Sequence, residues 1–373
     1  MADILLLTLK VFSATGGIEK VCRIAGKALY EYSLENQHAL DVLSMHDEQK
    51  HAYGNLYFPN EIFIGYGVNK AGFILDAVRR GRKAKVVILS HINLLVVGRA
   101  IKMVSPETKV IMFAHGIEVW GNLSKRKTNM LKSCDMILAV SSFTRDSLMD
   151  LHGIEAQKSM VLNNTLDPFL PLHKPSEYHL DLRKRYNIPE NVYILFTLTR
   201  LSAKEKYKGY DNVVKALAEI STIRNDVFYL IGGSYDEEEK NALEIEINKL
   251  GISGKVCLTG FLPDHELAEH FNLADLYVMP SKKEGFGIVF IEAMYYGLPV
   301  IAGNQDGSVD ALLNGELGTL VNPDNVHELK TAILQKLDNL SESTPDRKKL
   351  ISHFSYEVYK TKVNQLLNDM LQR

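Results

Sequence analysis

The sequence predicts an α/β protein with two domains, each built around a parallel β-sheet. Its 373 residues exceed the length at which a single hydrophobic core keeps growing, so two domains are expected. Short β-rich runs alternate with helical patterns along the whole chain, as they do in βαβ units. Residues 167–191 carry four prolines and little periodicity, which is typical of a linker between domains.

In the first half, short apolar runs indicate strands. The expected strands are 3–8, 39–44, 61–64, 86–89, 109–113, 136–140 and 159–162. A helix is expected to begin just after Gly16-Gly17, because apolar residues recur at helical spacing from Ile18 to Tyr32.

In the second half the same alternation restarts. The expected strands are 192–198, 227–231, 255–258, 276–279 and 299–301, and the expected helices are 211–223, 236–250, 264–273 and 287–296. Further short units continue to about residue 337, and a last helix is expected over 355–371, with no strand after it.

The composition is that of a soluble globular protein of a reducing compartment. Apolar residues make up 46% of the chain and charged residues 24%, which excludes a disordered chain. The three cysteines, Cys22, Cys134 and Cys257, lie far apart, which argues against a disulfide framework or a zinc site. The apolar run at the N-terminus is too short for a signal peptide or a membrane span. A cytoplasmic location is therefore expected.

Charge is divided unevenly between the halves. Residues 1–170 hold 20 Lys/Arg and 16 Asp/Glu, a net +4, whereas residues 171–373 hold 23 and 29, a net −6. Residues 70–85 carry six basic residues against the single acid Asp76. This stretch either rests on an anionic lipid surface at the inner face of the membrane or is a solvated helix end. Nucleic acid is not an expected partner, because the chain is slightly acidic and shows no recognised binding module.

The most informative motif is Glu284-Gly-Phe-Gly-Ile-Val-Phe-Ile-Glu292, between a predicted strand and a predicted helix. In an open α/β sheet, this position is the carboxyl edge, where ligands bind. Gly285 and Gly287 let backbone amides approach a ligand, and the helix N-terminus favours a phosphate. Taken alone, the motif also fits an ordinary strand–turn–helix with a solvated glutamate.

The wider segment makes the functional interpretation specific. Thr259-Gly-Phe261, Pro280-Ser-Lys-Lys-Glu284, Glu292-Ala-Met and Gly297-Leu-Pro-Val-Ile-Ala302 follow one another in this order. Together they resemble the large retaining glycosyltransferase family four, or glycosyltransferase group 1, whose hallmark is two glutamates that flank seven residues. The resemblance covers nearly the whole chain and implies the GT-B fold, in which two Rossmann-like domains face each other across a cleft.

The resemblance also implies a role for each domain. Residues 1–170 would bind the acceptor, and residues 171–354 would bind a nucleotide-sugar. The C-terminal helix, 355–373, would pack back on the first domain.

The candidate catalytic residues are expected on loops that follow strands. In Arg200-Leu-Ser-Ala-Lys-Glu-Lys-Tyr-Lys208-Gly, the resemblance implies that Arg200 and Lys208 neutralise the diphosphate leaving group. Because this loop is long, Lys204 or Lys206 is an alternative to Lys208. Glu284 would accept hydrogen bonds from sugar hydroxyls. His115, after strand 109–113, would touch the donor hexose, although a satisfied core histidine is the plain alternative.

Other residues are expected to bind the donor. The resemblance implies contacts from Gly17, Phe261, Phe286, Gly287, Ile288 and Glu292, with Glu292 taking the ribose diol. Trp120 is either a sugar-stacking platform or a packed aromatic residue. Asp306-Gly307-Ser308 matches a loop that closes on the nucleotide in relatives, and it is equally an ordinary turn.

The expected activity is metal-independent transfer of a hexose, with retention of configuration. No Asp-x-Asp occurs in the sequence, so no metal site and no cofactor beyond the UDP- or GDP-sugar donor are expected. The acceptor would be a glycan or a polyprenyl-linked molecule in surface polysaccharide synthesis. Front-face attack and double displacement both remain open. Alternatives are a related sugar-nucleotide epimerase or phosphorylase and, in another class, a non-catalytic two-lobe sugar-binding protein.

Overall fold

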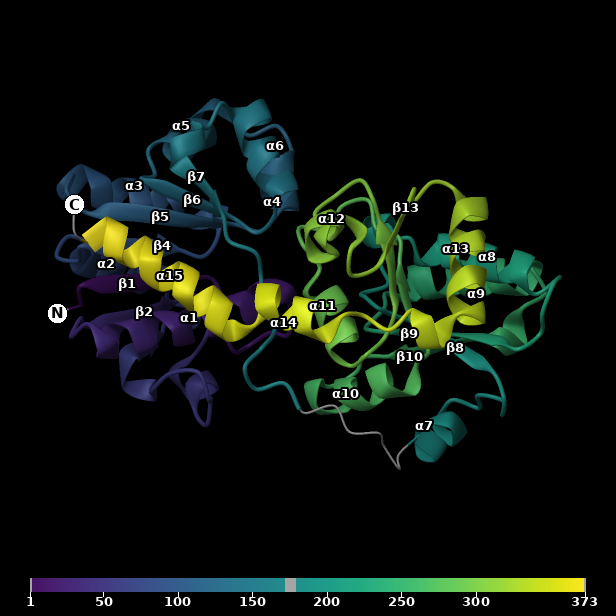
Figure 1. Cartoon of the computed structure of the whole chain (residues 1–373). Coiled ribbons are helices and arrows are strands. Elements are labelled where there is room, and N and C mark those ends of the chain that lie inside the picture. The colour runs from purple at the N-terminus through teal and green to yellow at the C-terminus, as the bar shows by residue number, and fades with distance from the viewer. Residues whose placement is uncertain (1, 172–178, 372–373) are drawn as a thin grey trace. The chain divides into compact units, whose positions relative to one another are not determined.

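The computed structural model describes residues 2–171 and 179–371, which form two compact units (Figure 1). The first unit combines Met1–Pro168 with Phe354–Arg373, and the second is Phe169–His353. The division after Pro168 lies two residues before the boundary expected from the sequence. Each unit is an α/β structure with its own hydrophobic core.

Within its described residues, the first unit holds a seven-stranded parallel sheet in the order β3-β2-β1-β4-β5-β6-β7. Its strands are β1 (Ile4–Thr8), β2 (Leu40–Ser44), β3 (Phe63–Gly65), β4 (Val86–Leu89), β5 (Lys109–Ala114), β6 (Met136–Ala139) and β7 (Ser159–Val161). β1 is central and completely buried, with Ile4 opposite Leu40 on one side and Val86 on the other. Burial on both faces explains why these strands read as continuous apolar runs.

Helices follow most of these strands. They are α1 (Gly17–Glu35), α2 (Lys70–Gly81), α3 (Leu95–Val104), α4 (Ile117–Trp120), α5 (Lys125–Lys132) and α6 (Ser142–His152). From the other end of the chain, α15 (Tyr356–Leu371) packs along α1 (Figure 1). The Tyr32 hydroxyl donates to Oδ1 of Asn368 at 2.8 Å, which ties the two helices together. Residues 372–373 of the expected C-terminal helix lie outside the described residues.

The second unit is built on the same plan. Its described residues form a six-stranded parallel sheet in the order β10-β9-β8-β11-β12-β13. The strands are β8 (Tyr193–Leu198), β9 (Val227–Gly232), β10 (Val256–Gly260), β11 (Leu276–Met279), β12 (Val300–Gly303) and β13 (Thr319–Val321). The helices are α7 (His179–Arg185), α8 (Tyr210–Ile220), α9 (Glu237–Lys249), α10 (Asp264–Leu273), α11 (Ile288–Tyr295), α12 (Ser308–Ala311), α13 (Val326–Asp338) and α14 (Arg347–Phe354).

The linker expected over 167–191 is wrong in part, because α7 lies inside it. Leu182 is buried, and the Tyr186 hydroxyl lies 2.8 Å from Nε2 of His270 on α10. A helix of seven residues, about two turns, is too short to give a clear periodic signal, and the flanking prolines conceal it further. Residues 172–178 of the expected linker lie outside the described residues.

Each sheet has a point where its connections diverge. In the first unit, the chain leaves β1 toward β2 and leaves β4 toward β5, so the divergence lies between β1 and β4. In the second unit it lies between β8 and β11. Ligands of open α/β sheets bind beyond the carboxyl ends of the strands at such points. No helix in the described ranges is long and apolar enough to cross a bilayer.

Candidate active site

Lys208 and Glu284 form an ion pair at the carboxyl edge of the second sheet. Lys208 ends the 3-10 helix Ala203–Lys208, which follows β8, and Glu284 lies on the loop after β11. The ammonium donates to Oε2 of Glu284, and each side chain is 17% exposed. Burial alone would lower the pKa of Lys208, but the attraction of Glu284 outweighs it and the pKa is raised. Both charges are thus held where β8 and β11 diverge.

Glycines bring the loops around this pair into backbone contact. Gly209, directly after Lys208, has a φ of +79°, and a Cβ there would lie 2.3 Å from the carbonyl oxygen of Pro280. At Gly307 a Cβ would lie 2.0 Å from the carbonyl oxygen of Gly285. Neither position tolerates a side chain without moving backbone. The loops after β8, β11 and β12 are therefore packed directly on one another.

Asp306 fastens the loop that carries Glu284. Its buried carboxylate accepts hydrogen bonds from Ser281 Oγ at 2.5 Å, Glu284 N at 2.6 Å and Ser308 N at 2.9 Å. Burial raises the pKa of Asp306, although these hydrogen bonds oppose the shift. The sequence alone allows two interpretations of the segment at Asp306: a loop that closes on the nucleotide, or an ordinary turn. No local signal distinguishes the two, since the contacts come from residues up to 25 positions away.

Arg200 does not join the pair. It follows β8 on the same loop, its side chain is 66% exposed, and Nη1 lies 3.5 Å from Oε1 of Glu205. Of the alternatives to Lys208, Lys206 is engaged elsewhere, with Nζ 3.4 Å from Oε2 of Glu239. Lys208 is thus the lysine of this loop that meets Glu284.

The remaining donor-binding candidates of the second unit differ in exposure. Gly287 precedes α11 and Ile288 begins it, so both stand at the helix N-terminus beside Glu284. The side chains of Phe286 and Glu292 are buried, at 1% and 2% exposure. The structure therefore shows no open surface at the carboxylate expected to take the ribose. Phe261 is 59% exposed after β10, with β9 and β8 between that strand and β11.

His115 and Gly17 lie at the carboxyl edge of the first sheet. The His115 ring follows β5, and its Nε2 lies 2.7 Å from the carbonyl oxygen of Ser90, which follows β4. A carbonyl only accepts hydrogen bonds, so Nε2 carries a proton in this contact. Gly17 begins α1, is exposed, and a Cβ there would meet nothing within 4 Å. A ligand can therefore approach the backbone at this point.

Trp120 and the basic stretch both lie in the first unit. Trp120 is packed, with its ring edge-to-face on Phe143 and its Nε1 donating to Thr144 Oγ1 at 3.3 Å. Of the basic stretch 70–85, the part from Arg79 to Lys85 lies just before β4, at the amino edge of the sheet and opposite His115 and Gly17, whereas Lys70 begins α2. There Arg80 pairs with Asp41 at 2.6 Å and with Asp76 at 2.7 Å. Part of the positive charge in this stretch is therefore neutralised inside the fold.

Two family models match adjacent parts of the chain. The model described as "Glycosyltransferase Family 4" matches residues 15–168, and "Glycosyl transferases group 1" matches residues 180–353. Among curated relatives, the GDP-mannose-dependent alpha-(1-6)-phosphatidylinositol monomannoside mannosyltransferase of Mycolicibacterium smegmatis is 29% identical over 239 residues. That match spans 60% of this chain and 60% of the relative. Mannosylfructose-phosphate synthase of Agrobacterium fabrum is 26% identical over 212 residues, 55% of this chain and 45% of the relative.

Solved structures share the fold over almost the full length. HepE of Anabaena, solved with UDP and glucose, has a TM-score of 0.80 at 18% identity, covering 98% of this chain and 99% of that one. Sucrose-phosphate synthase from Thermosynechococcus elongatus has a TM-score of 0.78 at 18% identity, with 99% of each chain covered. The expected GT-B fold is confirmed, and the chain belongs to the glycosyltransferases of family four and group 1, whose two domain models it matches in order.

Proposed function

We propose that this chain transfers a hexose from a UDP- or GDP-linked donor to a glycan or lipid-linked acceptor, with retention of configuration and without a metal ion. The observation that carries the proposal is the Lys208–Glu284 pair where β8 and β11 diverge. A nucleoside diphosphate leaving group needs cations that are already in position, and the hexose needs a carboxylate beside them.

The contacts of the pair suggest a division of roles. An ammonium group has three N–H donors, and Glu284 takes one from Lys208, which leaves two for phosphate oxygens. Arg200 adds a guanidinium that is mostly exposed and can move to the phosphates. The N-terminus of α11 at Gly287 and Ile288 favours the same negative charge. Glu284 keeps acceptor capacity for sugar hydroxyls, and Glu292 is assigned to the ribose.

The relatives support this donor class. The mannosyltransferase of M. smegmatis is named for GDP-mannose, and HepE was solved with UDP, with UDP-glucose, and with UDP and glucose. Retention by front-face attack fits the pairing of Glu284 with Lys208, because a carboxylate engaged by a cation is a weaker nucleophile. The bond from the anomeric carbon to the phosphate oxygen would break as the bond to the acceptor oxygen forms, and the proton of the acceptor hydroxyl would pass to the departing phosphate.

The first unit is proposed to bind the acceptor. At its carboxyl edge, His115 is assigned to the donor hexose and Gly17 to the donor diphosphate. A lipid-linked acceptor in surface polysaccharide synthesis would place the enzyme at the inner face of the membrane. Arg82 and Lys83 are the exposed basic residues most suited to contact anionic lipid, because Arg80 is paired. Sedimentation with anionic vesicles tests this contact: Arg82→Glu with Lys83→Glu should reduce it, and a wild type that does not sediment at low salt contradicts it.

A donor panel tests the proposed function. The protein is incubated with UDP- and GDP-hexoses, with and without EDTA, and released nucleoside diphosphate is measured. One donor class should release nucleoside diphosphate at a rate that EDTA leaves unchanged. Formation of hexose 1-phosphate from a glycan and added inorganic phosphate would instead indicate a phosphorylase, and conversion of the donor to its epimer an epimerase. Binding of free sugar with no turnover of any donor would favour a sugar-binding protein.

A further inference from the structure

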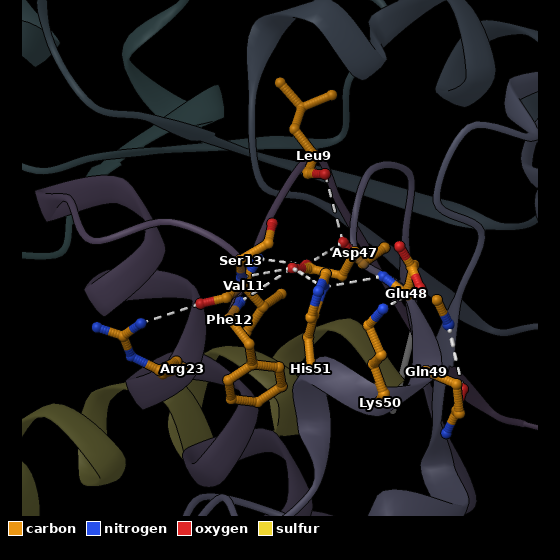
Figure 2. A network of polar contacts seen from close by, with 12 residues as sticks. Leu9, Val11, Phe12, Ser13, Arg23, Asp47, Glu48, Gln49, Lys50 and His51 are labelled. Atoms are coloured by element: carbon orange, nitrogen blue, oxygen red, sulfur yellow. Dashed lines mark hydrogen bonds and ion pairs between the residues drawn. The ribbon is translucent and has the colours of Figure 1, made fainter.

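Asp47 gathers the loop after β1 around one buried carboxylate (Figure 2). Its side chain is fully buried directly beyond β2. The carboxylate accepts hydrogen bonds from three backbone N–H groups: Val11 at 2.6 Å, Phe12 at 3.3 Å and Ser13 at 2.7 Å. The Ser44 hydroxyl donates to the same carboxylate at 2.5 Å. These hydrogen bonds outweigh burial and hold the pKa of Asp47 below its ordinary value.

Two further contacts fix the same loop. Arg23, on α1, donates from Nη1 to the carbonyl oxygen of Val11 at 3.0 Å (Figure 2). The Phe12 ring packs against both Phe58 and Phe63, with ring centroids 5.6 and 5.4 Å away. The loop is therefore held through its backbone by Asp47, through a carbonyl by Arg23, and through a side chain by the aromatic cluster.

This fixed loop carries the exposed start of α1. Only three residues separate Ser13, the last residue held by Asp47, from Gly17. Residues 15–17 are exposed, and a Cβ on Gly17 would meet nothing within 4 Å. At Gly16, in contrast, a Cβ would lie 2.5 Å from Oε2 of Glu19. Packing inside the protein thus gives no reason for glycine at position 17, whereas close approach of a ligand does.

The second unit uses the same arrangement. There Asp306, beyond β12, accepts the backbone N–H of Glu284 on the loop that leaves the neighbouring β11. In both units, a buried aspartate after one strand fixes the loop of the adjacent strand at the point of divergence. Asp135 differs: it also accepts a backbone N–H, from Val110 at 2.7 Å, but at the amino edge of its sheet. A matched carboxylate away from the site is therefore present in the same unit.

We propose that Asp47 is a positioning residue for the reaction, which fixes the loop 9–13 and thereby sets the substrate-facing backbone at Gly16-Gly17. The expected effect on catalysis rests on the proposed function, whereas the expected effect of Asp47 on the loop does not. Asp47 touches no reacting atom in this scheme. It acts through the backbone amides that donate hydrogen bonds to its carboxylate.

The experiment compares Asp47→Asn, Asp135→Asn, Gly17→Ala and the double variant Asp47→Asn/Gly17→Ala in the full-length protein. Hydrogen–deuterium exchange of residues 9–17 reports the hold on the loop, and kcat and KM with the best donor report its consequence. Asp47→Asn should speed exchange in this loop at least tenfold and lower kcat at least tenfold, with near-UV circular dichroism unchanged. Asp135→Asn should leave loop exchange unchanged and kcat within twofold.

The double variant separates positioning from general stability. If Asp47 acts through the glycine loop, the loss in the double variant is smaller than the product of the two single losses. Multiplying losses, or unchanged exchange in Asp47→Asn, overturns the proposal. If Asp47→Asn does not fold, Ser44→Ala, which removes one donor but keeps the charge, takes its place in the same cycle. If Asp47→Asn speeds exchange in the loop but the wild type turns over no donor, the proposed function is contradicted while the hold of Asp47 on the loop stands.

Discussion

The Lys208 ammonium and the Glu284 carboxylate are in direct contact, although they are 76 positions apart in the sequence. The contact exists because Gly209 allows the loop after β8 to lie against Pro280, and because Asp306 fixes the loop after β11. Two charges of opposite sign are thus held by backbone packing rather than by flexible side chains alone.

Removing the ammonium should destabilise the second unit measurably. Lys208→Met leaves the mostly buried Glu284 carboxylate without its partner, which should lower the free energy of unfolding by about 1–3 kcal/mol. Lys349→Met is the control, because its partner Glu316 is 59% exposed and stays solvated when the ammonium is lost. That variant should leave the free energy of unfolding nearly unchanged. Urea unfolding measures both, and equal effects would show that the Lys208 pair is not special.

The two glutamates of the motif should fail in different ways. Glu284→Ala should lose transfer while keeping affinity for nucleoside diphosphate, because its proposed contact is with the hexose. Glu292→Ala should weaken binding of nucleoside diphosphate itself, because its proposed contact is with the ribose. Calorimetric titration with UDP and GDP distinguishes them. Indistinguishable defects would show that one of the two roles is misassigned.

Adding one methyl group at Gly307 should displace the loop that carries Glu284. Its Cβ would lie 2.0 Å from the carbonyl oxygen of Gly285, so the loop carrying Glu284 must move. Gly307→Ala should lower stability by about 1–3 kcal/mol and weaken nucleoside diphosphate binding at least tenfold. Gly254→Ala is the control, since a Cβ there meets nothing within 4 Å. Tight binding by Gly307→Ala would mean that this packing does not shape the site.

Acid should cancel the stabilisation that Asp47 provides. Its pKa is lowered in the folded protein, so its contribution is complete above the unfolded pKa, near 4, and is lost as the pH falls through the folded value. Asp47→Asn should therefore be less stable than wild type by about 2 kcal/mol at pH 7, with a smaller gap at pH 3. Urea unfolding at both pH values checks this. A difference in stability that grows on acidification would contradict a lowered pKa of Asp47 in the folded protein.

The strands could be predicted because a strand that is buried on both faces has an apolar sequence that can be recognised locally. β1 and β11 are buried along their full length, so each reads as a continuous apolar run between polar segments. The sequence does not predict the helix α7, because seven residues are too few to show a clear periodic pattern. The confirmed resemblance rests on glycines and glutamates in the segment 257–321, where the local order of residues is specific.

The candidate site could be predicted only in part. The sequence left Lys204, Lys206 and Lys208 as alternatives, because the path of a long loop depends on what it packs against. In the structure, the backbone contact of Gly209 with Pro280 brings Lys208 to Glu284. Asp47 could not be found from the sequence at all. Its backbone donors lie 34 to 36 positions away, and nothing near it in the sequence distinguishes it from other aspartates.

The release of nucleoside diphosphate by wild type and by Lys208→Ala, from the same nucleotide-sugar and acceptor, tests the central claim most directly. Wild type should release nucleoside diphosphate in proportion to glycosylated product, and Lys208→Ala should do so at least 100-fold more slowly, since one leaving-group cation is lost. Lys206→Ala should stay within about threefold of wild type. Release by Lys208→Ala at the wild-type rate would contradict the account, as would a wild type that turns over no nucleotide-sugar.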